Sequence, residues 1–420
     1  MKTSHMLKAS LLATAVSLLT ACGDDGDSTT PAAGTPAAAA SVGVLTDAAV
    51  GGVAYTTAPS NLSGTTNAKG EYQFRAGDTV TFTLGGSTLQ VPASGRITPA
   101  TIAAHLFSGD EAKIANATTN LAVLFQTLDA DNDPSNGITV DGSITLTGFT
   151  PSTALAQAPA TFTTTLDTAL PASVDPVTPQ AAIKHYYGNE LIGSWKASHL
   201  KETVTYAGRD ETGVEDVDTD DNLGFLFSFD PQGRFIYSTW GLAVDGYDER
   251  SGDIAIGQVV YPETGTTVSL TGHATRRLVS GTSFSATDPT EEFLDPDNTV
   301  ELKLVNDKLV ITLHWADDYD EDGQEDQIVS VLTLSRLQNQ QNGLLGSWAE
   351  LEGSSSQTTV NSDGTVDFGD DVMGLYAYYV SSSRIVFVTL DMPTAGDDNE
   401  RNGLLVADYT RSGNTITLGA

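Results

Sequence analysis

Cysteine is nearly absent from this chain of 420 residues, and the single one is Cys22. One thiol cannot form an intramolecular disulfide, and a zinc site built from several cysteines is excluded as well. Stability must therefore come from hydrophobic cores, and the length predicts about two or three domains. The helix formers Lys, Arg and Met are sparse while Thr, Ser, Gly and Val are abundant, so we expect a mainly β fold.

Basic residues are scarce as well, with 20 Lys and Arg against 54 Asp and Glu and a formal net charge of −34. Nucleic-acid binding needs clustered Lys and Arg side chains to contact phosphates, so the composition predicts no nucleic-acid partner. Anionic membrane surfaces would repel the chain for the same reason.

Long hydrophobic runs are the third absence, since no run reaches the roughly 20 apolar residues that a membrane-spanning helix needs. The first run follows Lys2 and Lys8 and ends at Cys22, which is the pattern of an export signal. Its last four residues, Leu19 to Cys22 (LTAC), resemble the lipobox of bacterial lipoproteins. An ordinary secretory signal with an incidental cysteine is the alternative.

The lipobox resemblance implies that residues 1–21 form a removable signal peptide and that the Cys22 sulfur carries a lipid anchor. Each buried methylene contributes roughly 0.8 kcal/mol, so several acyl chains such as palmitate anchor firmly. Gly23 in the second mature position resembles the enterobacterial pattern for release to the outer membrane. Residues 22–41 are rich in Gly, Ala, Ser, Thr and Pro and predict a flexible tether.

Residues 42–188 are predicted to form a β-sandwich with helices. The stretch GTTNAKGEYQF resembles carboxypeptidase-regulatory-like modules, which are mostly spacers, and places Tyr72 and Phe74 on one face of a strand after a tight turn at 67–70. Apolar residues at 3.6-residue spacing predict a helix over about 110–128. Thr178 and Pro179 are typical of the start of another short helix.

Residues 189–338 contain a Gly-x-Trp motif ending at Trp195 and an arginine about 140 residues later, Arg336, on the last strand of the segment. This pair resembles the lipocalin superfamily, and the resemblance implies an eight-stranded antiparallel β-barrel. In that family the tryptophan seals the closed end while the arginine packs over its ring, a contact worth roughly 0.5–2 kcal/mol. A generic antiparallel meander is the alternative.

Residues 343–420 are predicted to form a shorter, related β repeat. LIGSW at 191–195 returns as LLGSW at 344–348, so that Trp348 corresponds to Trp195. GLAVDGYDERSGDIAIG from 241 is matched in the same order by GLLVADYTRSGNTITLG from 403. The copy is short for eight strands, so we expect a partial sheet or a truncated barrel.

Two acidic stretches are candidate calcium loops. Two like charges about 4 Å apart repel by roughly 4 kcal/mol at an effective dielectric constant of 20, so a tight acidic turn favours a bound cation. Carboxylates at alternate positions, as in the start of a calcium loop, occur in both stretches. The alternative for both stretches is an acidic loop that is solvated and binds no metal. A third stretch, residues 215–222, is a weaker calcium candidate with the same alternative. The candidate ligands are Asp318, Asp320, Asp322, Gln324 and Asp326 in DDYDEDGQED, and Asp129, Asp131 and Asp133 in DADNDPSNG.

Catalytic motifs are not found in the sequence. It contains no G-x-S-x-G elbow, H-E-x-x-H pair or Walker loop, and its histidines show no paired metal-ligand spacing. We therefore predict no catalytic residues and a protein that is not an enzyme. The sequence predicts a lipid-anchored outer-membrane protein that binds or adheres at the cell surface, with calcium in its acidic loops. The alternatives are a lipocalin-like carrier of a small apolar ligand and an unrecognised secreted hydrolase.

Replacing Cys22 with serine removes the predicted acylation site, so we expect the protein to leave the membrane fraction. Intact-mass spectrometry of the processed wild type should find fatty acid on Cys22 and no residues before it. A wild-type mass without lipid, or unchanged fractionation of Cys22→Ser, would contradict the lipoprotein interpretation.

Overall fold

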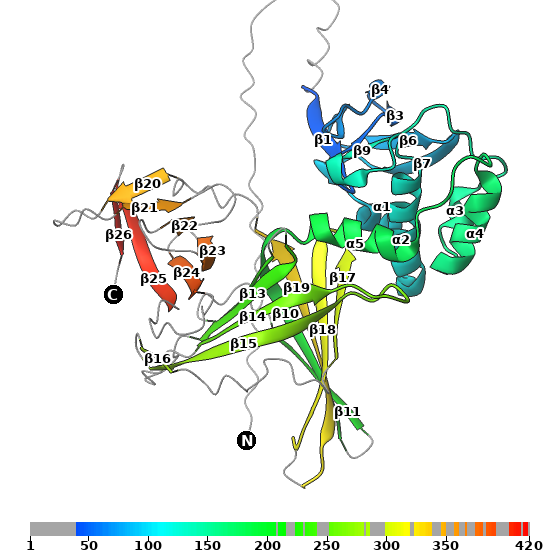
Figure 1. Ribbon diagram of the computed structural model, residues 1–420. Helices are drawn as coiled ribbons and strands as arrows, with labels where there is room; N and C mark the ends of the chain where they lie inside the picture. Colours follow the sequence, from blue (N-terminus) through cyan, green and yellow to red (C-terminus); the bar gives the residue numbers. More distant parts are fainter. Residues whose placement is uncertain are drawn as a thin grey trace, which may run out of the picture. The chain divides into compact units, whose positions relative to one another are not determined.

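The computed structural model describes residues 39–206, 209–215, 223–229, 232–241, 252–280, 283–285, 299–319 and 323–337, followed by the backbone of seven short strands. The described chain is mainly β, as predicted, with strands β1 to β26 and a few short helices (Figure 1). Cys22, the signal peptide and nearly all of the predicted tether lie outside the described residues.

The N-terminal module contains two small β-sheets that pack face to face. One has the order β5-β1-β8 and the other β4-β3-β6-β7, and β2 pairs with β9. The Tyr72 ring from the first sheet lies 5.4 Å from the Phe82 ring and 5.8 Å from the Tyr55 ring of the second, measured between centroids. The predicted sandwich is therefore present. Its strands are β1 (Ser41–Leu45), β2 (Val50–Gly51), β3 (Ala54–Ala58), β4 (Ser63–Thr65), β5 (Glu71–Phe74), β6 (Thr79–Leu84), β7 (Ser87–Pro92), β8 (Arg96–Ile97) and β9 (Ile138–Thr139).

Helices follow the sandwich strands, and their ends agree with the capping signals in the sequence. The predicted helix over 110–128 is α2, for which Asp110 accepts a hydrogen bond from the Lys113 N–H. The predicted start at Thr178 and Pro179 is that of α5, where the Thr178 hydroxyl accepts from the Ala181 N–H. The helices are α1 (Pro99–Leu106), α2 (Glu111–Thr127), α3 (Pro151–Ala154), α4 (Pro159–Ala169) and α5 (Pro179–Glu190), with a 3-10 turn η1 (Pro134–Asn136).

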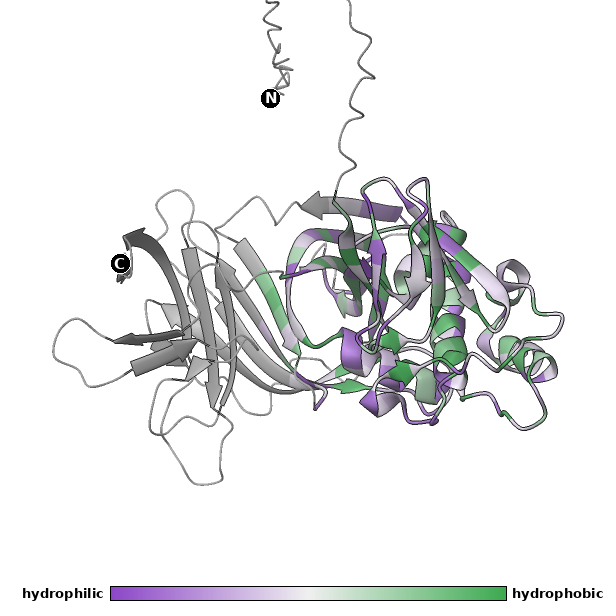
Figure 2. Ribbon diagram, turned by 90° about the horizontal axis from the view of Figure 1, so that it is seen from above, coloured by the Kyte–Doolittle hydropathy of each residue, from purple (hydrophilic) through white to green (hydrophobic). Residues whose placement is uncertain are grey.

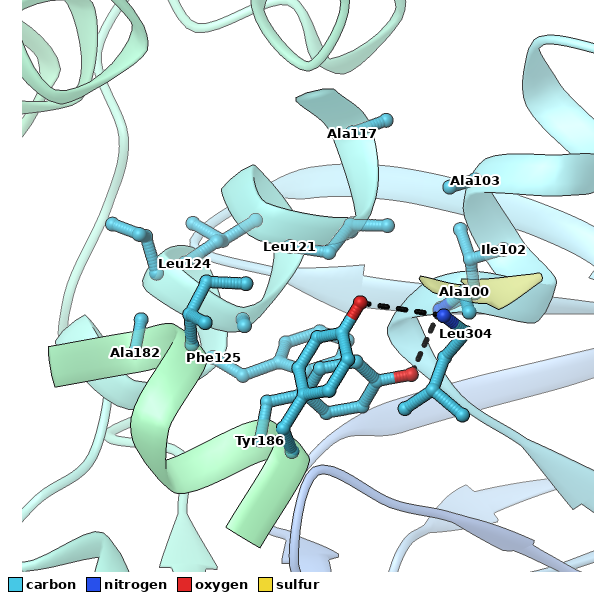
Figure 3. Close-up of a cluster of buried hydrophobic side chains, with 14 of the residues drawn as sticks. Ala100, Ile102, Ala103, Ala117, Leu121, Leu124, Phe125, Ala182, Tyr186 and Leu304 are labelled. Atoms are coloured by element: carbon cyan, nitrogen blue, oxygen red, sulfur yellow. Dashed lines mark hydrogen bonds between the residues drawn. The ribbon is translucent and has the colours of Figure 1, made fainter. Parts of the chain in front are cut away.

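The helical core forms around α2, which packs against α1, α4 and α5. Figure 3 shows Leu121 and Phe125 of α2 facing Ala182 and Tyr186 of α5, and all four side chains are buried. Hydrophobic residues on these helices are visible in Figure 2. A helix buried along so much of its surface is held by packing rather than by helix propensity.

The following strands form one antiparallel sheet in the order β15-β14-β13-β12-β10-β19-β18-β17, with β16 on β15 and β11 on β10. A bridge between Val268 and Leu302 joins the two ends, where the Leu302 N–H donates to the Val268 carbonyl at 2.9 Å. The sheet is therefore a nearly closed eight-stranded barrel. Its strands are β10 (Gly193–Tyr206), β11 (Arg209–Glu215), β12 (Leu223–Phe229), β13 (Arg234–Gly241), β14 (Gly252–Val260), β15 (Ser269–Ser280), β16 (Ser283–Ser285), β17 (Thr299–Val305), β18 (Lys308–Asp317) and β19 (Asp326–Arg336).

Aromatic side chains pack together inside this sheet near its Trp195 end. Phe227, Phe229 and Phe235 are buried, with ring centroids 6.0–6.3 Å apart. Gly257 on β14 lies at a bulge against this cluster, where an added Cβ would lie 2.0 Å from the Thr271 carbonyl oxygen and 2.5 Å from the Phe235 ring. The interior is therefore packed closely enough here to require glycine.

Two further antiparallel sheets lie in the C-terminal part, in the orders β20-β21-β22 and β23-β24-β25-β26. Trp348 belongs to β20, as Trp195 belongs to β10, and nothing is described of the Trp348 side chain. The relationship of this part to the barrel stays a prediction. Its strands are β20 (Gly346–Ala349), β21 (Gln357–Val360), β22 (Val366–Asp367), β23 (Gly374–Val380), β24 (Arg384–Asp391), β25 (Gly403–Ser412) and β26 (Thr415–Leu418).

Gly257→Ala should destabilise the protein by about 2 kcal/mol or more, because the new methyl group overpacks the barrel core. Urea unfolding measures the change. Gly213→Ala is the matched control, because Gly213 also lies in a strand but an added Cβ would meet nothing within 4 Å. Equal effects of the two substitutions would show that the interior is not tightly packed at Gly257.

Candidate functional site

The C-terminal end of α5 meets the start of the barrel at the two residues that the lipocalin resemblance singled out. Trp195 on β10 and Arg336 on β19 are paired across the sheet, and the guanidinium carbon of Arg336 lies 4.2 Å from the centroid of the Trp195 ring. Trp195 is 1% exposed. The structure thus brings both residues together at one end of the barrel.

The same two side chains also bind the end of α5. The last carbonyl groups of a helix have no partner within it and need one from elsewhere. The Trp195 indole N–H donates to the Leu191 carbonyl at 2.9 Å, and Arg336 donates through Nη1 to the Ile192 carbonyl at 2.5 Å and through Nη2 to the Glu190 carbonyl. A positive charge at this position also interacts favourably with the helix dipole.

Gly193 explains the glycine of the Gly-x-Trp motif. Its φ angle is +110°, which side chains disfavour, and an added Cβ would lie 3.4 Å from Nη1 of Arg336. Glycine at this point lets the chain turn from α5 into β10 beneath the guanidinium. The motif is therefore part of the connection between helix and barrel.

Glu190, the last residue of α5, forms a buried ion pair that links the two modules. Its carboxylate is 4% exposed and lies 2.5 Å from Nη2 of Arg96 on β8 and 3.9 Å from Nη2 of Arg336. Arg96 also lies 3.5 Å from Asp307, in the turn between β17 and β18. Burial raises the pKa of Glu190, and the charges of Arg96 and Arg336 oppose this rise.

Two neighbouring tyrosines of α5, Tyr186 (labelled in Figure 3) and Tyr187, strengthen the connection. The Tyr186 hydroxyl accepts a hydrogen bond from the Ala100 N–H of α1 at 3.4 Å, and the Tyr187 hydroxyl accepts from the Leu304 N–H of β17 at 3.3 Å. Burial raises the pKa of Tyr187 to about 12, so the hydroxyl keeps its proton at neutral pH. Helix α5 therefore contacts the helical module and the barrel at the same time.

A cavity of about 160 Å³ lies within this connection. It is smaller than the roughly 300–1,000 Å³ of typical ligand sites. Its charged groups already hold one another, and the Lys308 ammonium donates to the Ser335 hydroxyl at 2.6 Å. These observations indicate a structural joint rather than a ligand site. The lining residues are Arg96, Thr98, Ala100, Tyr186, Glu190, Trp195, Leu304, Asp307, Lys308, Ser335 and Arg336.

Asp47 is a fully buried carboxylate beneath α2 and α5. Its Oδ2 atom accepts a hydrogen bond from the Gln126 amide at 3.1 Å, whereas Oδ1 is buried without a partner. Burial raises the pKa of Asp47 well above its ordinary value, and the Glu190 charge adds to the rise. No sequence motif points to Asp47, Arg96 or Glu190, because their partners lie far away along the chain.

The acidic loop after α2 brings Asp129 and Asp131 together. Asp129 is 3% exposed, and its Oδ1 accepts from the Thr139 N–H at 2.8 Å while Oδ2 is buried without a partner. Burial raises the pKa of Asp129, and the adjacent Asp131 carboxylate raises it further. The Asp133 carboxylate caps η1 by accepting from the Ser135 N–H at 3.2 Å.

The acidic turn between β18 and β19 is described only in part. Asp318 accepts a hydrogen bond from the Gly323 N–H at 2.9 Å, and Asp326 accepts from the Tyr319 N–H at 3.2 Å. Gln324 is exposed, while Asp320, Asp322 and nearly all of the stretch at 215–222 lie outside the described residues. Within the described ranges, no group of three His, Cys, Asp or Glu side chains is arranged to hold a metal ion. Calcium binding therefore stays a prediction.

Comparison with known proteins gave no relative for this chain, because no family model and no curated protein matches it. The helices of the described part were also compared with the length and hydropathy of membrane spans, and none of them meets both requirements.

The raised pKa of Asp47 gives a prediction with a definite sign. A carboxyl group whose pKa is raised in the folded state contributes stability below its unfolded pKa of about 3.9 and loses it as the pH rises. Urea unfolding should therefore show that Asp47→Asn gains stability relative to the wild type as the pH rises above about 4.

Asp78→Asn is the control with the opposite sign. Burial opposes the change, but hydrogen bonds from the Ser60 side chain and from the Arg75 and Ser60 N–H groups lower the pKa of Asp78. A lowered pKa contributes stability that is lost as the pH falls, so this variant should lose stability relative to the wild type as the pH rises. A parallel pH response of both variants would contradict the assignment for Asp47.

Proposed function

We propose that this chain is a non-catalytic, lipid-anchored protein of the bacterial cell envelope that binds a surface partner or mediates adhesion. The anchor is the acylated Cys22, at the end of a signal peptide that resembles those of outer-membrane lipoproteins. The tether of residues 22–41 holds the folded part away from the membrane. The excess of acidic residues makes nucleic acid an unsuitable partner.

The packed interior next to the Trp195 end carries this proposal. Phe227, Phe229 and Phe235 pack together at this end of the barrel, and the adjoining joint cavity is too small for a drug-sized molecule. The lining of that cavity contains charged and hydroxyl groups that hold one another, with no nucleophile next to a histidine base. A rigid scaffold of this kind supports display and binding rather than storage or catalysis.

A carrier of a small apolar ligand is the second candidate, because an eight-stranded barrel can enclose one small ligand. Its site would lie toward the end of the barrel away from Trp195. Calcium in the acidic loops belongs to the proposed function in either case, since extracellular calcium modules bind with dissociation constants of about 0.1–1 mM.

Native mass spectrometry of the mature protein, extracted from membranes in mild detergent, separates the two candidates. The binding-protein proposal predicts the mass of the acylated polypeptide without another stoichiometric organic molecule. A one-to-one apolar adduct that remains after detergent exchange would overturn it in favour of the carrier.

A further inference from the structure

Asp129 is a buried carboxylate at the start of the acidic loop that follows α2. Residue Asp129 follows the last turn of α2, and 3% of it is exposed. Its Oδ1 atom is held by the Thr139 N–H, while Oδ2 is buried and has no hydrogen-bond partner. Burying a polar atom without a hydrogen-bond partner costs folding free energy, and burying a charged atom costs more. A ligand for Oδ2 would therefore stabilise the folded protein.

Asp131 adds a second carboxylate next to the first and is held in place. Its Oδ1 accepts from the Asp133 N–H and its Oδ2 from the Asn136 amide, both at 3.0 Å. The chain reverses between the two carboxylates at Asn132, whose φ angle is +58°. The two carboxylates interact directly, and like charges repel one another.

The base of the loop is fixed by the backbone. The Ala130 N–H donates to the Thr139 carbonyl at 2.9 Å, and the Asp141 N–H donates to the Leu128 carbonyl at 2.8 Å. These hydrogen bonds hold the loop in the conformation in which the two carboxylates are neighbours. A cation that binds here has little chain ordering to overcome.

We propose that Asp129 and Asp131 bind one calcium ion, with Oδ2 of Asp129 as the buried ligand. Oxygen ligands suit calcium, and its flexible coordination lets water and backbone carbonyls complete the shell around two carboxylates. Asp133 is not a ligand, because it caps η1 instead. The inference rests on the proposed location outside the cytoplasm, where weak extracellular-type affinity is sufficient.

Isothermal titration of calcium chloride into the EGTA-treated mature protein tests the site. The wild type should bind calcium, and Asp129→Asn should lose one equivalent of binding, because the amide keeps the bond from Thr139 but not the charge. Asp133→Asn, in the same loop, should bind as the wild type does, because asparagine can also cap η1.

Melting temperatures measured with and without calcium distinguish the loss of a ligand from misfolding of the variant. Without calcium, Asp129→Asn should melt at the wild-type temperature or above it, because a buried, repelled charge has been removed. With calcium at about ten times its dissociation constant, the wild type should gain roughly 3–6 °C over its calcium-free form and Asp129→Asn should not.

Other results overturn the inference in distinguishable ways. If Asp318→Asn removes the calcium response while Asp129→Asn keeps it, the ion binds the β18–β19 turn, and the calcium part of the proposed function survives without this site. If the wild type binds no calcium, both the site and that part of the proposed function fail, while the lipid anchor is unaffected.

Discussion

The contact of Arg336 with Trp195 at the end of α5 is the interaction on which the rest of the described structure depends. One guanidinium covers the indole ring and donates to the carbonyls of Glu190, the last residue of α5, and of Ile192, while the indole N–H donates to the carbonyl of Leu191 between them. The side chains that close the barrel therefore also hold the helix that precedes it. Because Glu190 in the same turn pairs with Arg96 of the sandwich, barrel, helix and sandwich share one set of contacts.

Acidic residues in this chain fall into two groups with different consequences. The exposed majority gives solubility and repels polyanions. Among the residues that the structure describes, four acidic side chains are buried: Asp47, Asp78, Asp129 and Glu190. Burial disfavours their charged forms. Glu190 has the Arg96 guanidinium beside it, and Asp78 accepts hydrogen bonds from Ser60 and the Arg75 N–H. Burial raises the pKa of Asp47 and of Asp129, and the cation beside Asp129 is our proposal. The consequence of burying an acidic side chain thus depends on its neighbours.

Local sequence signals predicted local structure well. Apolar residues at 3.6-residue spacing predicted α2, and Thr178 with Pro179 predicted the start of α5. The partners of Glu190 could not be predicted in this way, because Arg96 and Arg336 are 94 and 146 residues away. The D-x-D-x-D pattern likewise grouped Asp133 with Asp129, although the proline after Asp133 starts η1 and makes that carboxylate a cap.

The central claim is that Arg336 and Trp195 couple α5 to the barrel, and hydrogen exchange during urea unfolding tests it most directly. In the wild type, the amides of α5 and those of β10 and β19 should lose protection at the same urea concentration. In Arg336→Gln, which lacks the charge and the guanidinium bonds, α5 should lose protection at a lower concentration than the barrel strands. Separate unfolding in the wild type, or joint unfolding that persists in Arg336→Gln, would contradict the account.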